Sequence, residues 1–196
     1  MADSGRDQPV PDPAPTSPAG HRAPVDGDTC LRELPWCGKI NLRGDPGDSR
    51  FVSAAADALG AALPLEVNTA APGGRATVFP RGPDEWLAHC ELDGAAALLQ
   101  QLRRRLAPLH HAATEVTDYY TVLELHGTDA AAALARGCPL DLHERVFKAG
   151  QCAQSRFGNA GILLYKPGPS PLFQVQVRWS FAEYLWDYLA GVLDSL

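Results

Sequence analysis

The chain has 196 residues, of which 45% are hydrophobic and 20% are charged, and this is the composition of an ordinary globular protein. Its formal net charge of −6 argues against nucleic-acid binding, because neutralising phosphates requires an excess of lysine and arginine. No segment reaches the roughly 20 apolar residues of a membrane helix, and the N-terminus lacks the apolar run of a signal peptide. We therefore expect a cytoplasmic protein without a membrane partner.

The N-terminal segment, residues 1–28, is rich in proline among alanine, serine, aspartate and glycine. Such a sequence cannot bury enough apolar surface to offset the entropy lost on ordering. We therefore predict a disordered tail over 1–28, followed by a folded domain over 29–196.

The first half of the folded part begins with a predicted strand at 38–44, "GKINLRG", and a helix within 45–60. Phe51, Ala55 and Leu59 recur at helical spacing, and Gly60 follows them at the position where a left-handed glycine ends many helices. The pattern then predicts strands at 64–71 and 75–80, a half-buried strand within 82–92, and a helix at 94–106 capped by Asp93.

The second half repeats this order. A strand is predicted at 119–127, and a helix follows at 128–137 with Thr128 as its cap and Gly137 as its stop. Ser180 and Glu183 have the spacing of a capping box at the start of a final helix. Between the two helices, alternating apolar residues predict strands at 151–157, 160–166 and 172–179.

Both halves share one order of features, namely a strand, a glycine, an acidic turn and an alanine-rich helix. The shared order predicts an α+β fold of two similar β-α-β-β-type units, at about 38–117 and 118–196. Each unit is expected to have an antiparallel sheet backed by helices.

The stretch "GCPLDLHERVFKAGQCAQSR" (137–156) holds the residues that most resemble catalytic chemistry. Cys138 or Cys152 could act as a thiolate nucleophile assisted by His143, but an isolated buried cysteine more often packs as a small hydrophobe. The chain has five cysteines and no CxxC pair, which favours a reducing compartment. No dinucleotide fingerprint, Walker lysine or metal-ligand spacing occurs, so we predict no catalytic, cofactor-binding or metal-binding residues.

Large aromatic side chains gather near the C-terminus, where Trp179, Tyr184, Trp186 and Tyr188 occur within ten residues. Such a cluster is explained equally well by core packing and by a subunit interface, where tryptophan and tyrosine are enriched. Together with Trp86, these four residues are our candidates for contact with a partner.

Several sequence blocks resemble the gamma subunit of heterotetrameric sarcosine oxidase. The resemblance extends from about Leu31 to the C-terminus, with one departure in the last block, where Trp179 interrupts the arginine-to-serine step. The blocks, in chain order, are "LRELPWCGKINLRGD", "GPDEWL", "RGCPLDLH", "CAQSRF" followed by "ILLY", and "RWSFAEYLWDYLA".

The resemblance implies a complex of four different subunits that oxidatively demethylates sarcosine to glycine, with formation of hydrogen peroxide and transfer of the methyl carbon to tetrahydrofolate. It implies alpha, beta and delta subunits as partners, with alpha as the direct neighbour. FAD, FMN, NAD, tetrahydrofolate and zinc would belong to the other subunits. It also implies a fold like the folate-binding domain of aminomethyltransferases, with no catalytic residue in this chain.

Three alternatives remain open from the sequence. The chain could serve a related complex such as N-methylglutamate dehydrogenase. It could be a stand-alone, folate-dependent aminomethyltransferase-like enzyme, or an unrelated thiol enzyme built on Cys138 or Cys152.

Overall fold

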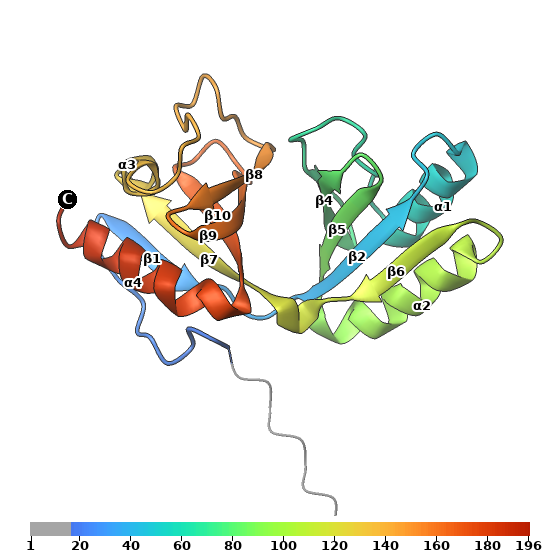
Figure 1. Ribbon diagram of the computed structural model, residues 1–196, viewed down its shortest axis with the longest axis horizontal. Helices are drawn as coiled ribbons and strands as arrows, with labels where there is room; N and C mark the ends of the chain where they lie inside the picture. Colours follow the sequence, from blue (N-terminus) through green and yellow to red (C-terminus); the bar gives the residue numbers. More distant parts are fainter. Residues whose placement is uncertain (1–16) are drawn as a thin grey trace, which may run out of the picture.

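The computed structural model describes residues 17–196, which form two β-sheets with helices on their outer faces (Figure 1). The inner faces of the sheets turn toward each other, and the two halves of the molecule open away from each other like the arms of a V. All strand pairs are antiparallel, so the predicted α+β architecture is confirmed.

The first unit has the strand order β3-β4-β5-β2-β6, with α1 and α2 packed on one face. Its strands and helices are β2 (Gly38–Gly44), α1 (Ser49–Leu59), β3 (Ala71–Pro72), β4 (Ala76–Gly82), β5 (Glu85–Cys90), α2 (Ala95–Leu106) and β6 (His111–Glu115).

The second unit has the order β1-β7-β10-β9-β8, with α3 and α4 on its outer face. Its strands and helices are β1 (Thr29–Glu33), β7 (Tyr120–Gly127), α3 (Ala130–Ala135), β8 (Cys152–Phe157), β9 (Ala160–Tyr165), β10 (Leu172–Arg178) and α4 (Ala182–Leu193). Short 3₁₀ turns precede α2, β7 and α4, at Leu92–Gly94, Thr117–Tyr119 and Trp179–Phe181.

The two units follow one plan, because β2, β4, β5 and β6 match β7, β9, β10 and β1 in sheet position. In the first unit the edge strand β6 comes last, after α2, as in a ferredoxin-like β-α-β-β-α-β motif. In the second unit the equivalent edge is β1, which precedes the whole first unit in the chain and pairs with β7. The chain therefore contributes one strand to the second unit before it forms the first unit.

Helix α1 forms as the sequence predicts. Asp48 caps its first turn by accepting a hydrogen bond from the Arg50 backbone N–H at 2.9 Å, and Gly60 ends it with φ of 62°. The spaced residues Phe51, Ala55 and Leu59 are all buried, which confirms that this face packs on the sheet.

Other local predictions are wrong. Residues 64–70 form an irregular loop rather than a strand, with Thr69 in an isolated bridge to Gln151, and only Ala71–Pro72 pair with β4. Asp93 lies inside a 3₁₀ turn and does not cap α2. Neither Thr128 nor Ser180 caps the helix that follows it, because preceding turns place other residues at the cap positions.

The prediction of a disordered tail is wrong for residues 17–28, while 1–16 lie outside the described residues. Ala19 is buried in the core of the second unit, and Val25 exchanges backbone hydrogen bonds with Leu31 at 2.9 and 3.0 Å. Arg22 forms an ion pair with Asp187 of α4 at 2.8 Å. A few apolar and paired side chains therefore hold this segment against the sheet despite its proline content.

A third, smaller cluster of buried side chains joins the units. It contains Phe79 of β4 and Cys152, Leu163 and Tyr165 of the second sheet, with the Phe79 and Tyr165 rings in an edge contact at 5.1 Å. Beside it, the His89 ring of β5 hydrogen-bonds the Gln176 side chain of β10 at 2.5 Å. Apolar and polar contacts thus fix one sheet against the other.

Candidate functional site

The cysteine-containing segment 137–156 does not bring a thiol and an imidazole together. Cys138 is buried in the core of the second unit, and its sulfur lies 3.7 Å from the Ser155 hydroxyl. His143 sits in a turn, where its Nδ1 accepts a hydrogen bond from the Arg145 backbone N–H at 3.2 Å. Burial raises the pKa of the Cys152 thiol to about 11, so it is protonated at neutral pH. The segment is built as packing and turn.

Two of the five aromatic candidates for partner contact are core residues, so that prediction is wrong for them. Trp86 is 1% exposed, packs on Phe51, and donates from its indole nitrogen to the Pro64 carbonyl at 2.7 Å. Trp186 is 4% exposed in the core of the second unit. Both face inward from a sheet or helix, a direction that tryptophan content alone does not reveal.

The other three candidates lie at the surface. Tyr184 and Tyr188 of α4 are each more than a third exposed, their rings form an edge contact with each other, and the Tyr184 ring forms another with Phe181. We call Tyr184 and Tyr188, together with Phe181 just before the helix, the aromatic face of α4. Trp179 is half-buried just before it, in an edge contact with Trp36 at 5.3 Å.

Hydrogen bonds to loops of the same unit hold the two tyrosines of the aromatic face in place. The Tyr184 hydroxyl accepts a hydrogen bond from the Asn159 backbone N–H at 3.3 Å, and the Tyr188 hydroxyl donates to the Arg136 carbonyl at 3.5 Å. The tyrosines therefore present their rings to the outside while their polar ends are already satisfied by loops of the same unit. A rigid, amphipathic aromatic surface of this kind loses little side-chain entropy when a partner covers it.

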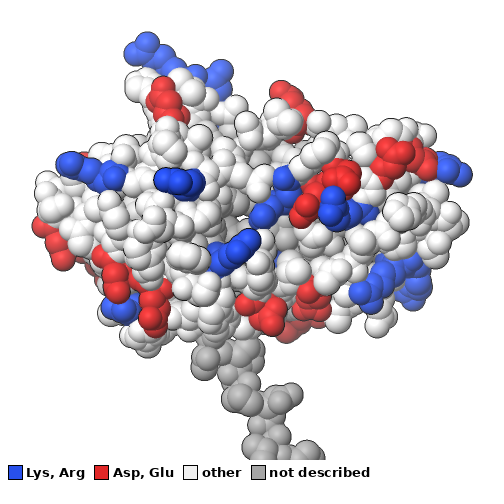
Figure 2. Space-filling view, viewed as in Figure 1, with Lys and Arg blue, Asp and Glu red and all other residues white. Residues whose placement is uncertain are grey.

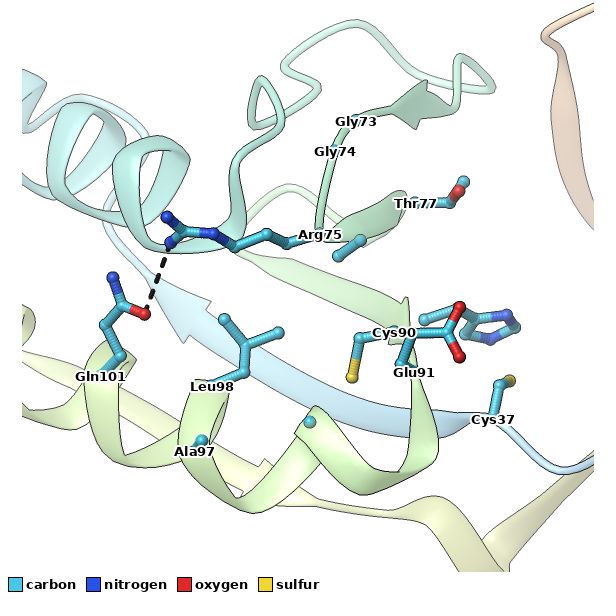
Figure 3. A pocket seen from close by; sticks show the side chains of 13 residues that line it. Cys37, Gly73, Gly74, Arg75, Thr77, Cys90, Glu91, Ala97, Leu98 and Gln101 are labelled. Carbon is cyan, nitrogen blue, oxygen red and sulfur yellow. Dashed lines mark hydrogen bonds between the residues drawn. The ribbon is translucent and has the colours of Figure 1, made fainter.

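A cavity of about 570 Å³ lies in the first unit, between the segment 73–77 and helix α2 (Figure 3). Arg75 crosses it and donates to the Ala58 carbonyl at 3.1 Å and to the Gln101 side chain at 3.4 Å. Cys37 and Cys90 face the same space from the start and the end of a strand pair.

The groups in this cavity do not combine into a nucleophile and a base. Burial, with a smaller contribution from nearby Cys37, raises the pKa of Cys90 to about 11. Burial and the positive charge of Lys39 lower the pKa of His89 to about 3, so the imidazole is neutral at physiological pH. Its Nε2 is already engaged by Gln176. Of the side chains that could act as nucleophile or base here, Cys90 is thus protonated and His89 is neutral, and Arg75 is occupied by the hydrogen bonds described above.

Residues 17–196 contain neither a metal-binding cluster nor a membrane-spanning helix. Within that range no three histidine, cysteine, aspartate or glutamate side chains gather closely enough to hold an ion, and none of the helices is long and apolar enough to cross a membrane.

The two-unit α+β fold is shared with other solved structures. The glycine cleavage system aminomethyltransferase T from Bartonella henselae matches 82% of this chain and 45% of its own, with a TM-score of 0.62 at 16% identity. The regulatory subunit of aspartate kinase from Thermus thermophilus matches with a TM-score of 0.52 at 15% identity. At these sequence identities the comparison shows a shared fold alone. It confirms the expectation that this chain folds like part of an aminomethyltransferase.

Among proteins with this fold, the amino-acid sequence matches one family. Residues 43–193 match the sarcosine oxidase, gamma subunit family. Sarcosine oxidase subunit gamma of Corynebacterium sp. (strain P-1) is 32% identical over 186 residues, covering 91% of this chain and 90% of the relative, and that of Arthrobacter sp. is 31% identical. A chain of the heterotetrameric sarcosine oxidase from Corynebacterium sp. U-96, solved with pyrrole 2-carboxylate, matches with a TM-score of 0.84 at 30% identity, over 92% of this chain and 95% of that one. The chain belongs to the sarcosine oxidase gamma subunit family.

Proposed function

We propose that this chain is the gamma subunit of a heterotetrameric sarcosine oxidase and that its role in the complex is structural. The observation that supports this most is its match, over nearly the full length of both chains, to a subunit of a solved heterotetrameric sarcosine oxidase. The side chains that could take part in a reaction also support a structural role, because burial holds Cys90, Cys152 and His89 in their neutral forms.

The proposed partners are the alpha, beta and delta subunits, with alpha as the direct neighbour. The aromatic face of α4 is the proposed contact, since Tyr184 and Tyr188 are exposed although their hydroxyls are tied down. Trp179 extends this surface toward the linker between β1 and β2, through its contact with Trp36. Trp86 and Trp186, which are buried in the cores, are not part of the proposed contact.

The first experiment compares the chain alone with the chain coexpressed with the other three subunits. Alone, it should be colourless and should form no peroxide from sarcosine. Coexpressed, it should copurify in stoichiometric amount. Sarcosine-dependent peroxide formation by the isolated chain, or demethylation of sarcosine with tetrahydrofolate, would replace the structural role by a stand-alone enzyme.

A second experiment tests the contact surface with Tyr184→Ala and Tyr188→Ala. Each should weaken retention in the complex by about tenfold or more, because central aromatic residues supply much of an interface's binding energy. Leu65→Ala is the matched control, as Leu65 is an exposed apolar residue of the first unit. Equal retention of all three variants would contradict the proposed surface.

A further inference from the structure

A second cavity, of about 420 Å³, lies where the two units meet and is distinct from the cavity beside α2. Arg81 at the end of β4 reaches it from the first sheet, while Gln154, Gln176 and Arg178 reach it from β8 and β10 of the second. Its volume is within the range of small-molecule sites. Residues from both units are required to form it, so it exists only when the two sheets are docked.

The cavity is positively charged, although the chain as a whole is negative. Arg81 and Arg178 are the charged residues that line it, and no aspartate or glutamate lines it with them. Over residues 17–196, neither guanidinium forms an ion pair. Figure 2 shows basic side chains beside the hollow where the two lobes meet. Arg32 and Arg43 of β1 and β2 differ from them, since each pairs with a carboxylate.

Both arginines are held in place by aromatic rings. The Arg81 guanidinium lies over the Tyr120 ring at 5.4 Å, and that of Arg178 lies over the Tyr119 ring at the same distance. The Gln154 side chain donates to the Arg81 backbone carbonyl at 2.7 Å, which fixes the end of β4 against β8. The two cations are therefore positioned before any ligand arrives, so that less entropy is lost on binding.

The Nε–H of Arg81 is buried and has no hydrogen-bond acceptor among the described residues. A buried donor without an acceptor costs free energy, and most native structures satisfy such groups. Gln176 also lines the cavity, but its side-chain oxygen is already engaged by His89. An acceptor from outside the chain would satisfy the Arg81 donor.

We propose that this cavity binds a carboxylate, held by Arg81 and Arg178. A guanidinium presents its N–H groups in a planar fork that matches the two oxygens of a carboxylate, and charge-assisted hydrogen bonds of this type are among the strongest in proteins. Two such groups without a counter-ion, one with an unsatisfied buried donor, form a site for a planar anion.

Two sources could supply this carboxylate. One is a small free acid, and the other is an aspartate or glutamate side chain of a neighbouring subunit. Phe181 lines the cavity and also belongs to the aromatic face of α4, so an acidic side chain could enter from a partner seated on that face. The second source rests on the proposed function, whereas the first does not.

The first arm of the test uses the full chain with sodium acetate and sodium succinate as probes, titrated at constant ionic strength with chloride as the reference. Calorimetry should detect binding to the wild-type chain. Arg178→Gln, at an exposed position that should not affect folding, and Arg81→Gln should each weaken it by about tenfold or more, because each removes charge-assisted hydrogen bonds. Arg104→Gln, which makes the same charge change on the exposed face of α2, should leave it unchanged.

The second arm uses the coexpressed complex. If the carboxylate comes from a partner, Arg81→Gln and Arg178→Gln complexes should lose this chain at lower salt than Arg104→Gln and wild-type complexes. Arg81→Lys, which keeps the charge but loses the fork, should fall between them.

Probe binding that depends on Arg81 and Arg178 supports a free acid, and a salt effect confined to the same variants supports a partner side chain. If neither is observed, the carboxylate site is refuted. Failure of the wild-type chain to enter the complex would refute the proposed function instead, and the probe titration then decides the site by itself.

Discussion

The first and second units place the same strands in the same sheet order, but they differ at their edges and on their outer helices. The first unit completes its sheet with β6, which follows directly after α2, whereas the second takes its edge strand β1 from the start of the chain. Helix α2 exposes Arg103, Arg104 and Arg105, while α4 exposes Tyr184 and Tyr188. One fold plan therefore carries a charged outer face on one side and an aromatic one on the other.

The two units are therefore alike in the composition of their cores and differ in the residues that they expose on their outer helices. Both cores are built from leucine, alanine, phenylalanine and one large tryptophan. The outer helices differ because α2 faces solvent, whereas in our proposal α4 faces another subunit. The strand β1 also links the units, because the second sheet is incomplete without residues that precede the first, and the buried cluster around Phe79 joins the two sheets.

The largest expected effect comes from removing the tryptophan of either core. Trp86→Ala and Trp186→Ala should each lower the free energy of unfolding by about 3–5 kcal/mol, since both indoles are buried. Trp179→Ala, at a half-buried position, should cost less. Denaturant unfolding followed by circular dichroism measures all three.

The same measurement tests the dependence of the units on each other. Because β1 connects them, each core variant should shift one common transition. Two transitions, with only one moved by Trp86→Ala, would show that the units unfold independently despite the link through β1.

The strand-ending glycines Gly44 and Gly127 occupy equivalent positions in the two units and should respond unequally. A Cβ on Gly127 would lie 2.2 Å from the Asp28 carbonyl oxygen, at a φ of 139° that side chains rarely adopt. A Cβ on Gly44 would meet the Phe51 ring at 2.1 Å, and a side chain can shift more readily than backbone.

Gly127→Ala should therefore destabilise the protein by about 1–3 kcal/mol or more, and Gly44→Ala by a smaller amount. Melting temperatures of the two variants against wild type decide the order. A larger loss for Gly44→Ala would mean that the β1–β7 edge tolerates rearrangement better than the first core does.

The last expected effect depends on pH and concerns the contact between the units at His89. The pKa of His89 is lowered from 6.5 to about 3 in the folded chain, first by burial and then by Lys39. Between these values the unfolded chain binds a proton that the folded chain does not, so stability rises with pH over this window and is lost as pH falls.

Wild type should thus lose up to about 1.4 kcal/mol per pH unit more than His89→Gln between pH 6.5 and 3. The variant keeps a neutral polar side chain beside Gln176 but cannot take up this proton. Unfolding curves at a series of pH values give the difference, in which the contributions of shared carboxylates cancel. Parallel pH profiles would show that His89 titrates normally and that the contact between units is open to water.

Part of the candidate site could be predicted from sequence and part could not. The tyrosines of α4 were predicted as contact residues because tyrosine is enriched at interfaces, and both are exposed. The same composition argument failed for Trp86 and Trp186, because it does not say which side of an element faces the core. Arg81 and Arg178 were missed altogether, since 97 residues separate them in the chain and only sheet docking places them around one cavity.

The sequence by itself determined those features that depend on neighbours within a few residues. Examples are α1 between its Asp48 cap and Gly60, and the strand 172–178 with its alternating apolar residues. The tertiary structure alone decided the pairing of β1 with β7, the ordering of residues 17–28, and the burial of each tryptophan. Hydrogen bonds across one turn are encoded by adjacent side chains, whereas strand partners and buried faces are selected by the total apolar area that distant segments cover together.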